Sequence, residues 1–506
     1  MMHGGEKSDP AIVAGKPVND AEEAVEEPVE PRAGTKGNAV QPDTLRTQDR
    51  NGVAQGLDRI RQAARKGVRF TSLLHHVSVA ALREAFHALK REAAAGVDGL
   101  TWAGYAADLE RRLTDLHERV HKGGPYRPQP ARRVYIAKPD GQRRPLAVAA
   151  LEDKIVQRAV QEVLNAIYEE EFLWFSYGFR PGRGQHDALD ALCTAITSRK
   201  VNYIVDADIR KFFDTVSHEW LIRFLEHRIG DKRIIRLIVK WLKAGVLEDG
   251  AVTVSDRGTG QGAVISPLLA NIYLHYVIDL WAVHWRRTEA EGAMIIVRYA
   301  DDLVAGFEHE AEARRFLEAM RARLEQFELA LHPDKTRIVA FGRQVAVGGG
   351  GPGKPGTFDF LGFTFICAKS QKGRFLLKRK SRRDRVRAKL KEIKGALRQR
   401  MHRPIDETGQ WLAQVVRGFF NYHAVPTNSR TLAAFRNRVL ELWISVLKRR
   451  SNRAKITRKL IARLRDYLPP ARIRHPWPQE RFAVKHPRWE PYAGKPHVRF
   501  CAGGAR

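Results

Sequence analysis

Closely spaced carboxylates stand out first in the segment VNYIVDADIRKFFDTVSHEWL, residues 201–221. Its apolar residues predict a strand that places Asp206 and Asp208 on one face, ahead of a helix that begins near Ser217. An acid on a buried strand needs a partner, because an unpaired charge is costly to remove from water. The partner of Asp208 is therefore either a basic side chain or a bound cation.

Two more carboxylates lie in the segment MIIVRYADDLVAGF, residues 294–307, where apolar runs flank Asp301 and Asp302. The pattern predicts a β-hairpin with both acids at its tip. A solvated turn would explain them on an isolated hairpin, but the apolar flanks indicate a tip beside a core. If the two strands are neighbours, Asp208 joins Asp301 and Asp302, and the three acids repel one another unless cations bind. Such oxygen ligands suit Mg²⁺, and a pair of ions stabilises the attacking and the leaving oxygen of a phosphoryl displacement.

A glycine-rich turn precedes an apolar helix in RGTGQGAVISPLLANIYLHYV, residues 257–277. Backbone at Gly260 and Gly262 can approach a ligand closely, and Gln261 offers an amide for hydrogen bonding. A tight connection between two elements explains the glycines equally simply.

A basic hairpin is predicted in VYIAKPDGQRRPLAVAALEDKIVQRAV, residues 134–160, by two strand-like runs around a Pro-Asp-Gly turn. It presents Lys138 and Arg144 on its two arms. Such bases are usually solvated surface charges, but as a pair they could also bind a triphosphate.

The composition narrows the class of protein that these elements belong to. The chain has 506 residues, with 88 Lys and Arg against 57 Asp and Glu, and a formal charge of +31. At roughly 150 residues per domain, this length suggests about three domains. No run approaches the roughly 18 uninterrupted apolar residues of a membrane helix, and Cys193, Cys367 and Cys501 form no CxxC pair. These features exclude a membrane-spanning protein and a disulfide scaffold, and the charge predicts a polyanionic partner, most commonly nucleic acid.

Charge and periodicity divide the chain into regions. Residues 1–55 hold ten acids and six bases and are rich in Pro, Gly and Ala, so we expect an acidic, disordered segment over residues 1–60. Residues 372–403 hold fifteen Lys and Arg against two acids, a net charge of +13. Beyond them, apolar residues at helical spacing between Trp411 and Val446 predict a small all-helical domain.

Five motifs together carry a family resemblance. DADIRKFFD, GQGAVISPLLANIYL, RYADDLVAGF, HPDKTRI and FDFLGFTF occur in this order, and the chain resembles bacterial group II intron-encoded reverse transcriptase/maturases from about residue 70 to its C-terminus. The helical segment WLAQVVRGFFNYHAVPTNSRTLAAFRNRVLELWISVLKRR resembles the maturase, or thumb, domain of that family. The order of the motifs makes the resemblance specific, whereas YADD alone would be weak.

The resemblance implies an α+β fold of the right-hand polymerase type, with antiparallel sheet in the fingers and palm and an all-helical thumb. The fingers would span residues 70–200, the palm with its active site 201–368, and the thumb or maturase domain 372–470. A basic C-terminal tail would follow over residues 471–506.

The resemblance also implies a catalytic metal site. In the family, the palm acids that match Asp208, Asp301 and Asp302 hold two Mg²⁺ ions, and Ile209 would contribute its backbone carbonyl. One ion would acidify the primer 3′-hydroxyl, and the other would neutralise charge on the departing pyrophosphate.

The other site residues follow from the same resemblance. Lys138 and Arg144 would grip the incoming dNTP, and Gln261 would contact the nascent base pair. Phe213 would pack under the sugar and exclude a 2′-hydroxyl, and Lys335 would donate a proton to pyrophosphate. The turn that supports the primer would consist of Phe360, Leu361, Gly362 and Phe363. A surface lysine and a core hairpin explain Lys335 and this turn about as well.

The sequence departs from the family pattern in two places. Gly260 stands where the family commonly has Pro, which loosens the turn but should leave Gln261 in place. After VRFCAGGAR no cysteine-bearing His-Asn-His nuclease domain follows, so we expect that this protein does not cut the second DNA strand itself and that its primer comes from another source.

RNA binding follows from the charge and from the resemblance. The basic stretch, and thirteen bases against two acids between residues 436 and 474, would bind backbone phosphates. The predicted RNA-binding residues are Lys378, Arg379, Lys380, Arg382, Arg383, Arg385, Arg387 and Lys389. Four aromatic side chains either stack on unpaired bases or, as their helical spacing favours, pack in the thumb core: Trp411, Tyr422, His423 and Trp443.

The resemblance implies the partners and the location. The partners would be the parent group II intron RNA, an RNA template with a DNA primer, a DNA target and dNTPs, without a membrane, in the bacterial cytoplasm. The favoured function is an RNA-directed DNA polymerase that assists splicing of its parent intron and inserts it by target-primed reverse transcription. A maturase-only splicing cofactor with an inactive polymerase fold is the alternative, although a relic has no physical reason to keep three mutually repelling acids. An intron-free antiviral reverse transcriptase is disfavoured by the maturase-like thumb.

Overall fold

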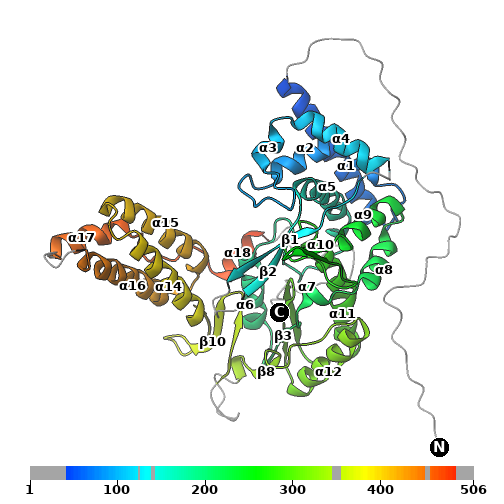
Figure 1. Ribbon diagram of the computed structural model, residues 1–506. Coiled ribbons are helices and arrows are strands. Elements are labelled where there is room, and N and C mark those ends of the chain that lie inside the picture. Colours follow the sequence, from blue (N-terminus) through cyan, green and yellow to red (C-terminus); the bar gives the residue numbers. More distant parts are fainter. Residues whose placement is uncertain (1–41, 123–125, 138–142, 345–354, 451–455, 486–506) are drawn as a thin grey trace, which may run out of the picture.

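The computed structural model describes residues 42–122, 126–137, 143–344, 355–450 and 456–485. Figure 1 shows helices of the N-terminal part at one end, sheets in the middle, and a separate group of helices from α14 (Arg383–Gln399) to α17 (Arg458–Tyr467) at the side. This mixed architecture confirms the predicted α+β fold class. None of the helices in the described ranges combines the length and the apolar character that crossing a bilayer requires.

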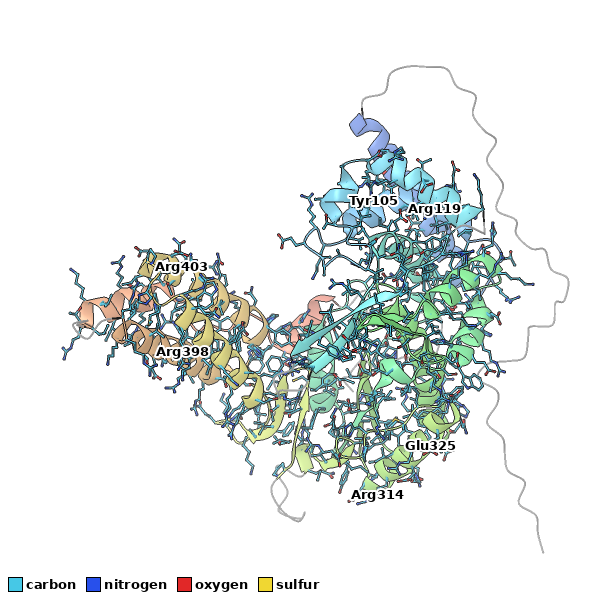
Figure 2. The ribbon with its side chains drawn as sticks, in the orientation of Figure 1. Tyr105, Arg119, Arg314, Glu325, Arg398 and Arg403 are labelled. Carbon is cyan, nitrogen blue, oxygen red and sulfur yellow. The ribbon has the colours of Figure 1, made fainter. Side chains whose placement is uncertain are left out.

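The N-terminal group packs amphipathic helices around one core. Its elements are α1 (Pro42–Arg65), a 3₁₀ turn (Leu74–His76), α2 (Val79–Ala88), α3 (Trp102–Ala106), α4 (Leu109–His121) and α5 (Leu151–Tyr168). The next helix, α6 (Gln185–Ser198), packs on a different core, described below. Helix α4 buries Leu113, Leu116 and Val120, which recur at helical spacing on one face. Arg119 on the same helix donates to the carboxylate of Glu152 on α5 at 2.9 Å (Figure 2).

Part of the segment predicted to be disordered is helical. The sequence predicted a disordered segment through residue 60, whereas α1 begins at Pro42, and residues 1–41 lie outside the described residues. Ile60 and Ala64 are buried in the N-terminal core, which stabilises the C-terminal half of the helix. The composition used for the prediction covers residues 1–55, and the residues of α1 that enter the core come after it.

A small sheet connects the N-terminal helices to the rest of the molecule. Its strand order is β2-β1-β4-β5, with β1 (Ala131–Ala137), β2 (Arg143–Val148), β4 (Val246–Glu248) and β5 (Ala251–Thr253). The predicted basic hairpin is present as the antiparallel pair β1 and β2, and its turn, residues 138–142, lies outside the described residues.

The central sheet carries the acidic motifs. Its order is β6-β7-β3-β8, and every neighbouring pair is antiparallel: β3 (Tyr203–Asp208), β6 (Met294–Tyr299), β7 (Asp302–Phe307) and β8 (Arg337–Ala340). Alternate residues such as Val205, Ala207 and Leu303 belong to the large core, because successive side chains of a strand point to opposite faces.

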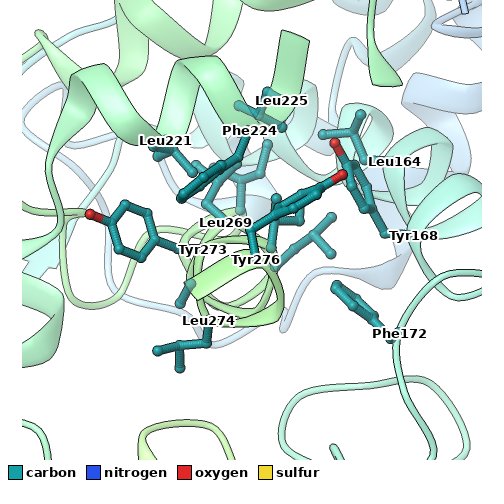
Figure 3. Close-up of a cluster of buried hydrophobic side chains, with 14 of the residues drawn as sticks. Leu164, Tyr168, Phe172, Leu221, Phe224, Leu225, Leu269, Tyr273, Leu274 and Tyr276 are labelled. Carbon is teal, nitrogen blue, oxygen red and sulfur yellow. The ribbon is translucent and has the colours of Figure 1, made fainter. Parts of the chain in front are cut away.

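The large core also includes the helices that follow β3. They are α7 (Phe212–Thr215), α8 (His218–Arg228), α9 (Lys232–Leu242), α10 (Ser266–Leu274) with a π-helical continuation (His275–Asp279), α11 (Leu280–Thr288) and α12 (Glu310–Gln326). Figure 3 shows Tyr168 of α5, Phe224 of α8 and Tyr273 of α10 in one buried cluster. The cluster ties the N-terminal helices to the helices beside the central sheet.

The opposite face of the central sheet packs on a second core. Ile204, Ile295 and Val304 lie there with residues of α6 and of a third sheet, whose order is β11-β10-β9. The third sheet consists of β9 (Thr357–Phe360), β10 (Phe363–Lys369) and β11 (Phe375–Ser381). By the two-residue period of the strands, Asp206, Asp208 and Asp302 share this face.

The C-terminal helices form their own core. Helices α14, α15 (Ile405–His423), α16 (Ser429–Lys448) and α17 enclose Leu412, Phe420 and Trp443, and Trp443 is 1% exposed. His423 is buried as well, and Tyr422 donates its hydroxyl to Leu361 O at 2.7 Å. The structure therefore favours the packing alternative for Trp443 and His423 over base stacking.

After α17 the chain returns to the central part of the molecule. We call residues 474–481 the C-terminal strap; they include the first turn of α18 (Pro478–Lys485). Arg481 of the strap donates to two acids of α6, Asp187 at 2.5 Å and Asp190 at 2.9 Å. The His475 ring stacks on His186 of α6, with 3.9 Å between ring centroids. The strap thus connects the helical group to α6.

Candidate active site

The tip of the β6–β7 hairpin holds two of the predicted acids. Tyr299 pairs with Asp302, so Ala300 and Asp301 form the two-residue turn. Ala300 has φ +55°, the left-handed conformation that such tight turns require. The turn packs closely on Gly178, where an added Cβ would lie 2.2 Å from Ala300 N. Only glycine at position 178 therefore allows this approach.

Asp208 lies directly across the sheet from the hairpin. It ends β3 and pairs in register with Asp302 of β7. Its carboxylate accepts a 2.8 Å hydrogen bond from Lys335 Nζ, and its carbonyl accepts from His332 N at 2.8 Å. Ile209, the next residue, forms an isolated antiparallel bridge with Leu331. The structure thus brings Asp208, Asp301, Asp302 and Lys335 to one end of the central sheet.

The electrostatics of this end favour a cation. Loss of water raises the pKa of Asp302 to about 7, and the negative charges of Asp301, Asp208 and Asp206 add to the shift, although the side chain still reaches solvent. Burial raises the pKa of Asp301 too, and the nearby charge of Arg144 opposes the increase. The neighbouring carboxylates therefore make it harder for Asp301 and Asp302 to ionise.

The donor set fits a hard divalent metal. Carboxylate oxygens are the ligands that Mg²⁺ prefers, and bound cations would relieve the repulsion among these acids. Within the described ranges, no three acidic, His or Cys side chains are gathered closely enough to enclose an ion as they stand. In the structure, the Lys335 ammonium contacts the Asp208 carboxylate and supplies a positive charge beside it.

Two of the predicted nucleotide-binding residues line a cavity between the glycine-rich turn, α7 and the small sheet. The cavity has a volume of about 320 Å³, and both Phe213 and Gln261 line it. Thr259 N donates to Phe213 O at 2.8 Å, and Ala147 N donates to Gln261 O at 2.6 Å. These bonds tie the glycine-rich turn to α7 on one side and to β2 on the other.

The turn keeps its place despite glycine at position 260. Ser266 Oγ donates to Gly260 O at 3.0 Å, so the first residue of α10 restrains the turn. Of the two predicted bases, Arg144 is exposed on β2 opposite Ile136. Lys138 lies outside the described residues.

The predicted primer turn joins β9 to β10. Phe360 pairs with Phe363, both are buried, and Leu361 and Gly362 have φ +46° and +79°. Arg382 N donates to Gly362 O at 3.0 Å, and the Tyr422 hydroxyl donates to Leu361 O. Residues at the base of the helical group therefore fix the turn.

The structure corrects one predicted RNA-binding residue. Arg379 is 2% exposed and donates to Asp190 of α6 at 2.6 Å, so it is a buried structural base. Arg382 pairs with Asp384 at 2.7 Å, and Lys389 with Glu392 at 2.7 Å. The other predicted RNA-binding residues are at least partly exposed, namely Lys378, Lys380, Arg383, Arg385 and Arg387.

Sequence reasoning missed a buried network under the hairpin tip. The Arg298 side chain is fully buried and donates to both carboxylate oxygens of Asp279, at 2.7 and 2.6 Å. It also donates to Asn271 Oδ1 at 3.1 Å, Ser176 Oγ at 2.8 Å and Ala300 O at 2.9 Å. A single Arg within an apolar strand was the available signal, because such a base needs a buried partner.

Comparisons with known proteins agree with this geometry. Residues 136–365 match the family model described as reverse transcriptase (RNA-dependent DNA polymerase). Protein YkfC of Escherichia coli (strain K12) is 35% identical over 312 residues, which cover 55% of this chain and 77% of YkfC. The group II intron-encoded protein LtrA of Lactococcus lactis subsp. cremoris is 43% identical over 155 residues, 30% of this chain and 26% of LtrA.

The similarity covers different shares of these relatives. An uncharacterized 91 kDa protein in the cob intron of Schizosaccharomyces pombe is 43% identical over 146 residues, which are 18% of its length. The chain thus spans most of YkfC but about a quarter or less of the intron-associated relatives. The matched segment, residues 136–365, contains the acidic strands and the glycine-rich turn. The chain therefore belongs to the reverse transcriptase family of RNA-dependent DNA polymerases and is related to group II intron-encoded proteins.

Proposed function

We propose that this reverse transcriptase extends a DNA primer on an RNA template with Asp208, Asp301 and Asp302 as ligands of two Mg²⁺ ions. The observation that carries the proposal is the register of the central sheet, in which Asp208 faces Asp302 and the turn beside them carries Asp301. When bound, the cations would stabilise charge on the attacking primer oxygen and on the departing pyrophosphate. The backbone carbonyl of Ile209 would be a further ligand.

Basic side chains around the acids would handle the triphosphate. Arg144 and Lys138 would bind its phosphates, because a pair of bases on one hairpin can clamp several phosphate oxygens. Lys335 Nζ lies 2.8 Å from Asp208 Oδ2. With cations bound to the carboxylates, its ammonium would be released from Asp208 and would donate a proton to pyrophosphate.

The cavity lined by Phe213 and Gln261 would receive the rest of the nucleotide. The Phe213 ring would pack under the sugar and leave no room for a 2′-hydroxyl, and Gln261 would contact the nascent base pair. Two restraints support this proposal, since the backbones of Phe213 and Gln261 are both hydrogen-bonded to neighbouring elements. The primer would rest on the turn of residues 360–363.

Removal of divalent metal tests the polymerase proposal directly. We expect incorporation of dNTPs onto a DNA primer annealed to RNA when Mg²⁺ is present, complete loss with excess EDTA, and recovery when Mg²⁺ is restored. Gel-resolved primer extension measures this result. If no extension occurs at any Mg²⁺ concentration while RNA still binds tightly and in a salt-sensitive manner, the maturase-only alternative takes its place.

We further propose that the protein assists splicing of a parent group II intron RNA and takes part in intron mobility. The support is the partial similarity to a group II intron-encoded protein, together with the basic surface of α14. Arg383, Arg385 and Arg387 are exposed on this helix, and Figure 2 shows Arg398 and Arg403 on the same helical group. Phosphates of a folded RNA are the polyanion that this surface would bind.

Neutralising three exposed bases of α14 should weaken RNA binding. With Arg383, Arg385 and Arg387 replaced by Ala, we expect lower affinity and a slope of log K against log salt that is smaller by up to about 2, since each phosphate contact contributes roughly 0.7 for single strands. Filter binding of intron RNA at several salt concentrations measures the slope.

The matched control removes the same charge from another helix. Arg314, Arg315 and Arg321 are exposed on α12, and Figure 2 shows Arg314 far from the C-terminal helices. Their replacement by Ala should leave the slope unchanged. Equal slopes for the α14 variant and the wild type would refute the proposed RNA surface.

A further inference from the structure

Phe179, in the loop between α5 and α6, combines exposure with backbone strain. Its side chain is among the exposed large apolar groups, at 53%, and its φ is +57°. A left-handed conformation is unfavourable for a residue with a Cβ, and a ring that is more than half exposed recovers only part of the free energy of burial. Contacts within the protein therefore offset the cost of a phenylalanine at this position only in part.

The residues on both sides prevent the strain from relaxing. On one side, Asn271 Nδ2 donates to Gly178 O at 2.6 Å, and Tyr177 N donates to Arg298 O at 2.9 Å. On the other side, the buried guanidinium of Arg180 donates to Leu173 O at 2.7 Å. Phe179 is thus presented to solvent by two fixed neighbours.

The ring is presented beside the proposed catalytic hairpin. Its centroid lies 6.3 Å from that of Tyr299, at an interplanar angle of 46°, and Tyr299 directly precedes the Ala300–Asp301 turn. Tyr299, Leu361 of the proposed primer turn and Tyr422 all pack against the second core. Phe179 therefore contacts a hairpin residue that shares this core with the proposed primer turn.

We propose that Phe179 is a stacking platform for the primer strand, with its ring against the face of a nucleotide near the primer terminus. The inference rests on the proposed polymerase function, which brings a nucleic-acid end to these acids. Nucleobases offer apolar faces of the right size, and stacking of a base on an aromatic side chain is insensitive to sequence. Covering the ring would remove its apolar surface from water.

The test uses opposite effects on stability and on binding. In the full-length protein, Phe179→Gly removes both the ring and the strain, so the melting temperature should be equal to or higher than that of the wild type. The Kd for a recessed DNA primer on RNA, measured by fluorescence anisotropy, should rise about tenfold. Phe179→Tyr should stay within about twofold of the wild type, and Val68→Ala, which changes another exposed apolar residue, should have no effect.

Substrates with abasic sites show whether the Phe179 ring stacks on the primer strand or on the template strand. If the ring stacks on the primer, abasic sites at the last primer positions should abolish the difference in Kd between the wild type and Phe179→Gly, whereas abasic sites in the template should preserve it. An unchanged Kd for Phe179→Gly, a lower melting temperature, or a difference abolished by abasic template sites would each overturn the inference. Because these are binding measurements, they remain decisive for Phe179 even if the wild type fails to extend primers and the polymerase proposal falls.

Discussion

Replacing Asp301 with Ala is expected to abolish dNTP incorporation while leaving the protein folded. Asp301 sits at the turn of the β6–β7 hairpin, beside the facing pair of Asp208 and Asp302. If it holds Mg²⁺, its loss removes several kcal/mol of stabilisation of the transition state, so extension should slow by about 10³-fold or more. Single-turnover primer extension measures this rate.

Thermal unfolding separates a catalytic role of Asp301 from a structural one. Asp301→Ala removes one of several mutually repelling charges, so its melting temperature should equal or exceed that of the wild type. Asp334→Ala is the matched control, because Asp334 lies in the turn before β8 and its side chain is 88% exposed. Extension within tenfold of the wild type by Asp301→Ala would remove this carboxylate from the metal site.

Replacing Arg298 with Met should produce the largest loss of stability. Arg298 is the only described side chain that donates to both carboxylate oxygens of Asp279, and both residues are fully buried. Among the described residues, His275 is the other basic group beside Asp279, with Nδ1 3.9 Å from Oδ2, but burial lowers its pKa to about 4, so it is neutral near pH 7. Without Arg298, Asp279 is therefore left as a buried charge with no cation beside it, which costs about 3–5 kcal/mol of unfolding free energy. Urea unfolding followed by circular dichroism measures the loss.

A second variant tests whether the loss of unfolding free energy comes from the unpaired charge of Asp279. Arg298→Met combined with Asp279→Leu removes both members of the ion pair, so it should be more stable than Arg298→Met alone. Extension should remain impaired in the double variant, because Ala300 O still lacks its 2.9 Å hydrogen bond from Arg298 and the turn beside Asp301 loosens. A destabilisation below about 1 kcal/mol for the single variant would contradict the argument.

Local patterns were sufficient to predict the elements that carry the acids. The β6–β7 hairpin and β3 are apolar runs bounded by polar turns, and helix α8 begins next to Ser217, as predicted. The predicted apolar helix after the glycine-rich turn is α10. The fold class was implied by the family resemblance that the ordered motifs carry. The roles of Lys138, Arg144, Phe213, Gln261 and Lys335 stay predictions.

Where the structure differs from the predictions, the cause is a contact between residues far apart in the chain, which local sequence patterns do not show. Charge density alone made Arg379 look like an RNA-binding residue, because its partner Asp190 is 189 positions away in the chain. Composition likewise hid α1, whose buried residues face a core built from later helices. The lone acid Asp279, in an apolar helical run, could have been matched to Arg298, since each residue needs a buried partner of opposite charge.

The C-terminal strap makes the completion of the fold depend on the progress of translation. Arg481 meets Asp187 and Asp190 across 294 and 291 positions of the chain. At about 5–20 residues per second, α6 is synthesised roughly 15–60 s before Arg481. The central sheet of a nascent chain can therefore fold before the helical group acquires this attachment, and translation that ends prematurely within the last helices would release a chain without the strap.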